Sequence, residues 1–221
     1  MKKTVQSALG LMVCSLLAAC ATPPKPQDLS AYRQNMPRSI LVIPPINNSP
    51  DTRSTYSFLS TTSLPIAEAG YYVFPVALVD QTFKENGVTN PTEMQSISPL
   101  KLREIFGADA AMYITVREYG TKYQIIQSVT TVSAEAKLID LKTGTTLWKA
   151  EKKASTDSNN SRGNLVGALI SAAVTQVVNQ VKDHGHDISS IVSNQLFQPN
   201  KHVGNGLLYG FRSPKYQKDG L

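Results

Sequence analysis

Cys20 is the residue whose chemistry is indicated most clearly by its surroundings. It ends the run Leu17-Ala18-Ala19-Cys20, which follows a basic start at Lys2 and Lys3 and an apolar stretch. A basic start, a short apolar stretch and small residues before a cut are typical of a secretory signal, and the stretch is too short for a stable membrane-spanning helix. A cysteine at the cut adds a thiolate, which is nucleophilic enough for alkyl transfer. We therefore expect a leader over residues 1–19 that is removed before Cys20.

The Leu-Ala-Ala-Cys ending resembles the bacterial lipobox, which the lipoprotein signal peptidase reads. The resemblance implies that Cys20 is alkylated with diacylglycerol and that the new N-terminus receives a further acyl chain such as palmitate. Two or more chains anchor a protein stably, whereas a single chain binds marginally at ~0.8 kcal/mol per buried CH2. Residue 21 is Ala rather than Asp, which by analogy with lipoprotein sorting favours the outer membrane, with the folded domain in the periplasm. The alternative is an ordinary leader in which Cys20 is a coincidence.

Two of the three histidines form the one cluster that could hold a metal ion. They lie in the run Asp183-His184-Gly185-His186-Asp187. A His-x-His pair with flanking carboxylates can bind zinc, but it needs a third ligand in a rigid frame. The same residues also suit a helix end, where a glycine terminates the helix and a histidine lies near the negative end of its dipole. We favour the helix end and predict neither a metal nor a cofactor.

Catalytic motifs are missing from the rest of the sequence. Cys14 leaves with the leader, so no cysteine remains to pair with a histidine. The chain has no Gly-x-Ser-x-Gly, no Walker loop and no Gly-x-Gly-x-x-Gly after its first expected strand. Four carboxylates lie near one another in sequence, but at turns and helix ends where capping explains them: Asp51, Glu68, Asp80 and Glu85. We predict no catalytic residue and no enzymatic activity.

Composition and charge exclude several other classes of protein. The chain has 221 residues, 41% hydrophobic and 17% charged, with a net charge of +6 that falls to +4 without Lys2 and Lys3. A charge of that size is weak evidence for nucleic acid, so we expect no nucleic-acid partner. Two cysteines cannot make a disulfide framework or a multi-cysteine zinc site.

The elements that would position any site are those of one domain. We expect the lipidated Cys20 and a Pro-rich extended tether over residues 20–37, a single domain over 38–197 and a surface-lying or disordered tail over 198–221. Strands are predicted at 38–44, 71–76, 110–119, 123–140 and 145–154. Helices are predicted after the turn at 47–51, with a break at Pro65, then at 78–86, from Ser98-Pro99 onward, around 165–181 and at 188–197. This order predicts an α/β fold (an α+β sandwich), with helices packed on a mixed sheet whose late strands form an antiparallel hairpin.

Residues 163–181 are nineteen residues without a charge, with small residues at 163, 167, 171 and 175. The spacing favours a helix packed on the sheet. Contact with a second protomer and insertion into a membrane are the alternatives, although the amides in this stretch are costly in lipid.

The sequence also resembles a known family from about residue 36 to 155 and again near its C-terminus. The matching strings are SILVIPPIN (39–47), SPD (49–51), TYS (55–57), EAGYYVFP (68–75), TFKENG (82–87), LREIFGAD (102–109), YIT (113–115) and GLLYGFRSPKY (206–216). They resemble a family of bacterial lipoproteins of unknown function, known from a neisserial surface-antigen candidate. The resemblance implies a domain similar in fold to the N-terminal domain of the Tol-Pal translocation protein, and it brings no catalytic residue.

The resemblance also implies a role as a transport accessory, in company with a curli-secretion-like lipoprotein. Our leading hypothesis is a non-enzymatic protein-interaction module of the outer membrane, acting in envelope transport or assembly as a homo-oligomer, a dimer, with an envelope partner. The alternative is a subunit of an oligomeric secretion pore, built from the hairpin at 124–152. The outward face of that hairpin would have to be apolar, yet it carries Glu135, Lys137, Lys149 and Glu151.

Overall fold

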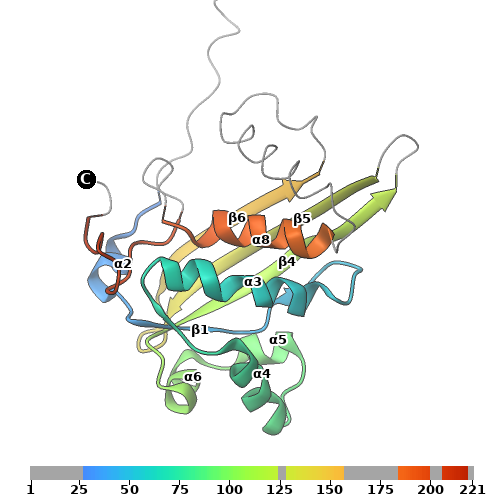
Figure 1. The fold of residues 1–221 in the computed structure, drawn as a ribbon. Helices are drawn as coiled ribbons and strands as arrows, with labels where there is room; N and C mark the ends of the chain where they lie inside the picture. Colours follow the sequence, from blue (N-terminus) through green and yellow to red (C-terminus); the bar gives the residue numbers. More distant parts are fainter. Residues whose placement is uncertain (1–26, 124–127, 157–183, 200–205, 219–221) are drawn as a thin grey trace, which may run out of the picture.

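The computed structural model describes residues 27–123, 128–156, 184–199 and 206–218 (Figure 1). Its centre is a six-stranded mixed sheet in the order β3-β1-β4-β5-β6, with β2 paired to β4. The predicted α/β class, with helices on a mixed sheet and late antiparallel strands, is confirmed. The strands are β1 (Ser39–Val42), β2 (Ile46–Asn47), β3 (Tyr72–Val73), β4 (Ala110–Tyr123), β5 (Ser128–Asp140) and β6 (Thr146–Ser155).

The parallel half of the sheet is short and buried. β1 lies between β3 and β4, and both pairings are parallel. Ile40, Leu41 and Val42 are fully buried, as expected for an apolar run covered on both faces. The predicted strand at 71–76 is shorter than expected, because helix α4 (Val76–Glu85) already begins after Pro75.

The antiparallel half of the sheet is long and has two different faces. β5 pairs with β4 on one side and with β6 on the other. Val132, Ala134, Ala136 and Leu138 alternate inward, as the period of two predicted. The single tryptophan, Trp148 of β6, is fully buried opposite Leu138.

Two helices cover the inward face of this antiparallel half. They are α3 (Ser54–Glu68) and α8 (His184–Phe197), which pack against each other (Figure 1). The larger core forms between them and the sheet and contains Phe58, Ile66, Trp148 and Phe197. Within the described ranges, none of the helices has both the length and the hydropathy to span a bilayer.

Three further helices pack on the opposite face of the sheet, beside its parallel half. They are α4, α5 (Pro91–Ser96) and α6 (Pro99–Phe106), and they bury a second core with Leu41 and Ile43. The capping hydroxyl predicted at Ser98 accepts a hydrogen bond from the Lys101 backbone N–H at 3.3 Å. Because these helices lie beside β1, much of the outer face of β4–β6 carries no helix among the described residues (Figure 1).

The break expected at Pro65 is wrong, because α3 runs through that residue. A proline inside a helix leaves the carbonyl of residue i−4 without its backbone donor. That carbonyl belongs to Thr61, and it accepts a hydrogen bond from the Ser193 hydroxyl of α8 at 2.9 Å. A neighbouring helix therefore supplies the donor that the proline removes. Gly70 ends the helix as predicted, with φ +103°.

The extended conformation expected for residues 21–37 is also wrong over its described part. Helix α2 (Ser30–Asn35) forms there, and its Tyr32 is fully buried. The Tyr32 hydroxyl shares a 2.7 Å hydrogen bond with the Tyr71 hydroxyl, which donates in turn to the Leu208 carbonyl at 2.7 Å. Leu208 itself is buried, so the described part of the C-terminal segment packs into the core instead of lying on the surface.

Candidate functional site: an exposed apolar surface over two helices

The predicted histidine pair lies in the first turn of α8. His186 is exposed, and its Nδ1 lies 3.3 Å from the Ser57 hydroxyl, which accepts a hydrogen bond from Tyr119 at 2.7 Å. This brings a serine and a histidine together from α3 and α8, a contact that no local sequence pattern predicts. These contacts join α3 and α8 to β4 near Tyr119.

The histidine pair gains no third ligand within the described parts of the chain. No group of three or more His, Cys, Asp and Glu side chains there could hold a metal ion. His202 lies outside the described residues.

The four clustered carboxylates do not converge on one place. Asp51 accepts hydrogen bonds from the Arg53 side chain, which lower the pKa of Asp51. Asp80 pairs with Lys84 at 2.7 Å, and Glu85 accepts from Gln81 at 2.7 Å, both within α4. Glu68 is the last residue of α3. The turn and helix roles expected from sequence account for these positions.

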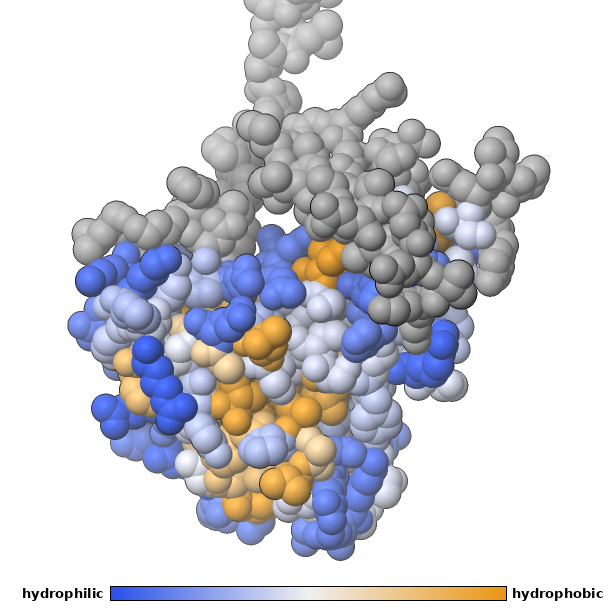
Figure 2. Space-filling model, in the orientation of Figure 1, coloured by the Kyte–Doolittle hydropathy of each residue, from blue (hydrophilic) through white to orange (hydrophobic). Residues whose placement is uncertain are grey.

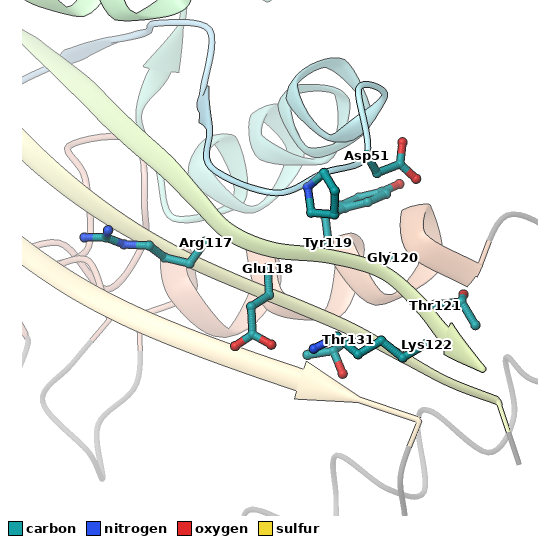
Figure 3. A pocket seen from close by; sticks show the side chains of 9 residues that line it. Asp51, Arg117, Glu118, Tyr119, Gly120, Thr121, Lys122 and Thr131 are labelled. Atoms are coloured by element: carbon teal, nitrogen blue, oxygen red, sulfur yellow. The ribbon is translucent and has the colours of Figure 1, made fainter. Parts of the chain in front are cut away.

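A cleft of about 370 Å³ lies at the far end of β4 (Figure 3). The loop at Pro50 and Asp51 forms one wall, and the backbone of β4 near Gly120 forms another. The side chains around it come from turn and strand positions and include Arg117, Glu118 and Lys122 (Figure 3). Arg117 is paired with Glu135 and Glu118 with Lys153, so two of these charges already have partners within the sheet and do not make a free set for one small ligand.

A second cleft of about 400 Å³ lies between α5 and the outer face of the sheet. Gln95 lines this cleft, and its side-chain amide donates to the carbonyls of Pro44 and Ile114 at 3.0 and 2.9 Å. These bonds connect α5 to the chain at Pro44 and to β4. Tyr113 also lines this cleft, and burial raises the pKa of its phenol. Neither group is paired with a nucleophile or an acid, so the cleft offers hydrogen bonds but no evident reaction.

The outer face of β4–β6 is charged. Glu135 lies opposite Glu151, and Lys137 lies opposite Lys149. Arg117 bonds Glu135 at 2.8 Å, and this hydrogen bond raises the pKa of the Arg117 guanidinium. A strand face with this charge pattern is unsuited to contact with lipid, which counts against the pore hypothesis.

An exposed apolar area lies over α3 and α4. Figure 2 shows hydrophobic residues gathered in the lower half of the view, where Figure 1 places α4 and its neighbours. Large side chains remain open to solvent on both helices, with Tyr56 47%, Leu64 64% and Leu78 59% exposed. Ala67 and Ala77 are also exposed on these helices. We call Tyr56, Leu64, Ala67, Ala77 and Leu78 the apolar surface.

Polar contacts at one border fix the two helices that carry the apolar surface. The Tyr56 hydroxyl lies 3.4 Å from Asp80, and the Lys84 ammonium lies 4.9 Å from the centre of the Tyr56 ring. Hydrogen bonds to Asp80 and Tyr56 raise the pKa of Lys84, so the ammonium stays charged at any physiological pH. Contiguous exposed apolar area with a polar rim is a mark of protein–protein contact sites. Sequence reasoning missed this surface, because Leu64 and Leu78 read as ordinary members of helical apolar patterns.

The family described as "Putative lipoprotein GNA1162-like" matches residues 27–212. The chain belongs to this family. "Putative lipoprotein NMB1124/NMB1162" of Neisseria meningitidis serogroup B is 47% identical over 205 residues, which cover 92% of this chain and 94% of that protein. The crystal structure of lipoprotein GNA1162 from Neisseria meningitidis is 53% identical and covers 65% of this chain and 100% of that chain, with a TM-score of 0.55.

The resemblance stated from the sequence is therefore confirmed. Because the family is one of lipoproteins, the chain is a lipid-anchored protein of the cell envelope. The names of the family and of its neisserial member attach no enzymatic activity and no cofactor.

More distant structures share the general arrangement of elements. A PelC dodecamer from Paraburkholderia phytofirmans is 13% identical, covers 64% of this chain and 86% of that chain, and has a TM-score of 0.39. The LpoB C-terminal domain from Salmonella enterica is 13% identical, covers 53% and 82%, and has a TM-score of 0.40. Likenesses this weak support no argument about the present chain.

Two predicted features lie outside the described residues. They are the leader with Cys20 and most of the uncharged stretch at 163–181. The lipid attachment at Cys20 and the packing of that stretch therefore stay predictions.

Proposed function

We propose that this chain is a non-enzymatic, protein-binding lipoprotein of the outer membrane, with its domain in the periplasm. It binds another envelope protein, and a second copy of itself, in envelope transport or assembly. The observation that carries the proposal is the apolar surface over α3 and α4. Water-exposed leucines on two packed helices gain free energy when a partner covers them, by about 1.5–3 kcal/mol for each fully buried side chain.

The rest of the described chain supports a binding role over a reaction. Neither of the two larger clefts is lined by a histidine or a cysteine, and the contact between Ser57 and His186 lies where α3 packs on α8. Family membership adds the lipid anchor. A lipid-anchored domain is confined to one surface, which raises its effective concentration toward partners in the same membrane.

The binding proposal is tested by crosslinking in cells. A photo-reactive amino acid at Leu64 or Leu78 should capture a partner, which mass spectrometry then identifies as a second copy or as another envelope protein. Leu100 of α6 is a matched control, because it is 60% exposed and lies at the start of a helix beside the β5–β6 turn. Equal capture from all three positions, or no capture from Leu64 and Leu78, contradicts the proposal.

A substitution test gives the energetic counterpart. Leu64→Ser with Leu78→Ser should weaken capture through a reporter placed at Tyr56 by about tenfold or more, since two apolar side chains are lost from the contact. Leu100→Ser should leave it unchanged. Because all three leucines are exposed, none of these variants should unfold the domain.

The anchoring part of the proposal is tested at Cys20. Cys20→Ser should stop diacylglyceryl transfer, because a hydroxyl is far less nucleophilic than a thiolate at neutral pH. The uncut precursor would keep its nineteen leader residues and disappear from outer-membrane fractions. A variant that matures and fractionates like the wild type would show that Cys20 is not the attachment site.

A further inference from the structure

The excess charge of the mature chain is concentrated in two short segments. Without Lys2 and Lys3 the chain has 20 Lys and Arg residues against 16 Asp and Glu residues. Residues 27–38 and 206–218 contain five of those cations and a single carboxylate, Asp28, so the remainder holds 15 of each and is formally neutral. The whole net charge of +4 therefore belongs to these two segments. We call their cations the basic surface: Arg33, Arg38, Arg212, Lys215 and Lys218.

The fold brings the two segments together at one edge of the domain (Figure 1). Tyr71 is hydrogen-bonded to Tyr32 of the first segment and to Leu208 of the second. A cleft of about 190 Å³ is lined by Arg33 and Met36 from one side and by Leu208 and Gln217 from the other. Residues that lie far apart in the sequence thus share one surface.

Aromatic rings contact three of the five cations of the basic surface, Arg38, Arg212 and Lys215. The Arg38 guanidinium lies 5.1 Å from the centre of the Phe211 ring, and that of Arg212 lies 5.3 Å from the same ring. The Lys215 ammonium lies 5.4 Å from the Tyr209 ring. These distances are those of cation–π contacts, which orient a cation without neutralising it.

The cations of the basic surface also remain available to an external anion. All five are exposed, and none has a carboxylate within 4 Å among the described residues. Elsewhere on the described domain some cations, such as Lys84 and Arg117, are paired with an acidic side chain, whereas others, such as Lys122 and Lys137, have no carboxylate within 4 Å among the described residues.

The chain length places this surface close to the expected anchor. Seven residues lead from Cys20 to Gln27, a reach of at most ~25 Å. Gln27 is itself fixed to the domain, because its side-chain amide pairs with the backbone of Lys149, accepting from its N–H at 3.0 Å and donating to its carbonyl at 2.9 Å. A lipid on Cys20 would therefore hold Gln27 near the membrane, and helix α2 with Arg33 follows directly after it in the chain.

We propose that the basic surface binds anionic phospholipid headgroups and so docks this edge of the domain on the membrane. The proposal rests on the lipid anchor of the proposed function for its orientation, but the binding itself is a property of the folded chain. Each Lys or Arg near an anionic membrane strengthens binding by about fivefold. Aromatic rings such as Phe211 and Tyr209 suit the headgroup level, where an apolar body and a polar environment meet. Docking at this edge fixes which surfaces of the domain face the periplasm.

The test uses the mature chain from Ala21, which lacks only the lipid-bearing cysteine and keeps every described residue. Co-sedimentation with vesicles of phosphatidylglycerol and phosphatidylethanolamine should show binding that neutral phosphatidylcholine vesicles do not. Binding should disappear when the salt is raised from 0.1 to 0.5 M, because the charges are then screened over a few ångströms.

Two charge-removing variants locate the binding. Lys215→Gln with Lys218→Gln, and separately Arg38→Gln with Arg212→Gln, should each weaken binding by about twentyfold or more. The first pair lies on the exposed tail, so it keeps the test valid if the arginine pair disturbs folding. Lys122→Gln with Lys137→Gln removes the same charge from β4 and β5, outside the basic surface and outside the Gln27 contact, and should change binding by less than about twofold at 0.1 M salt.

Equal binding to anionic and neutral vesicles, or an equal loss in the control variant, overturns the proposal. The outcome is separate from the anchoring test, because no lipid on Cys20 takes part. A failure of the Cys20→Ser prediction would remove the orientation argument and leave any measured headgroup binding in place.

Discussion

Removing the Ser193 hydroxyl should destabilise the domain by breaking the contact that completes α3 around its internal proline. The hydroxyl donates to the Thr61 carbonyl at 2.9 Å, and Ser193 is fully buried. Pro65 has no N–H to give to that carbonyl. Ser193→Ala therefore leaves this partly buried acceptor without the donor that the structure provides.

The expected magnitude follows from two opposing terms. A buried polar group left unsatisfied costs about 1–3 kcal/mol. Alanine has a better helix propensity than serine, which returns about 0.5 kcal/mol in α8. We expect a net loss of about 1–2 kcal/mol in the free energy of unfolding.

Ser189→Ala is the matched control on the same helix. Ser189 is also fully buried, but its hydroxyl donates to the Gly185 carbonyl at 2.8 Å, four residues earlier in α8. That carbonyl keeps the backbone N–H of the helix as a donor after the substitution. The free energy of unfolding should change by less than about 0.5 kcal/mol, because the lost bond and the gained propensity offset each other.

Urea unfolding followed by tryptophan fluorescence measures both variants. The chain has one tryptophan, and the Trp148 ring lies 6.2 Å from that of Phe197 in α8, so its emission reports the packing of this helix on the sheet. The comparison should use the change in midpoint at constant slope.

A double-mutant cycle decides whether the proline is the reason. Pro65→Ala restores a backbone N–H that can reach the Thr61 carbonyl, so Ser193→Ala should cost less in that background, with a coupling of about 1 kcal/mol. If Ser193→Ala costs the same in both backgrounds, the Ser193 bond does not replace the donor lost at Pro65 and the reasoning is refuted.

Two further predictions concern the C-terminal segment and an acidic turn. In Gly210→Ala the new Cβ would lie 2.5 Å from the Gly70 carbonyl oxygen, so the segment should detach and become sensitive to protease. Gly87→Ala has open space for its Cβ but a φ of +82°, so it should lower stability without exposing the C-terminal segment to protease. Asp51→Asn should destabilise the domain at pH 7 but not near pH 2. The hydrogen bonds from Arg53 lower the pKa of Asp51 in the folded state. The stabilisation is therefore present above the unfolded-state pKa of ~3.9 and is lost as the pH falls through the lower folded-state pKa. Urea midpoints across this pH range, compared with the wild type, measure the effect.

Periodicity was enough to predict five of the six strands and most of the described helices, but not the short strand β2. The alternation from Val132 to Leu138 predicted one wet and one dry face, and the register of β5 with β4 and β6 agrees. Glycines at 70, 107 and 144 ended elements where expected, since each has a positive φ. Alternation and turn glycines depend only on residues close together in the chain, so they can be recognised from the sequence alone.

The wrong predictions came from local rules that distant residues override. Pro65 is a helix breaker unless another element supplies a donor, and Ser193 lies far along the chain. Residues 30–35 carry too little apolar material to predict a helix, but Tyr32 gains a buried partner in Tyr71. Helix α5 was missed although Asn90-Pro91 is a start signal; the Asn90 side chain accepts from the Thr92 N–H at 2.8 Å.

The apolar surface and the basic surface were harder to predict, because each combines residues that are distant in the sequence. Leu64 and Leu78 belong to different helices, and a pattern along one helix does not show that α3 and α4 are in contact or that both leucines remain exposed. The basic surface joins the first and last described segments, so its charge looks diffuse when it is counted along the chain. Cys20 stays a prediction, because it lies outside the described residues and was inferred from a linear motif alone.

The contact between the two ends of the chain has a mechanical consequence for an anchored protein. Tyr71 follows directly after α3 and Gly70, and its hydroxyl joins α2 to the C-terminal segment through two 2.7 Å hydrogen bonds. Gly210 adds a 2.8 Å backbone bond to the carbonyl of Ala69, at the end of α3. A force on the anchor is therefore transmitted through Gln27 and α2 to the end of α3, the helix that also carries Leu64. These described segments are joined by the hydrogen bonds of Tyr71 and Gly210. The apolar surface is thus held at a fixed angle to the edge that carries the basic surface, which is the condition for one membrane-docked orientation to present one binding face.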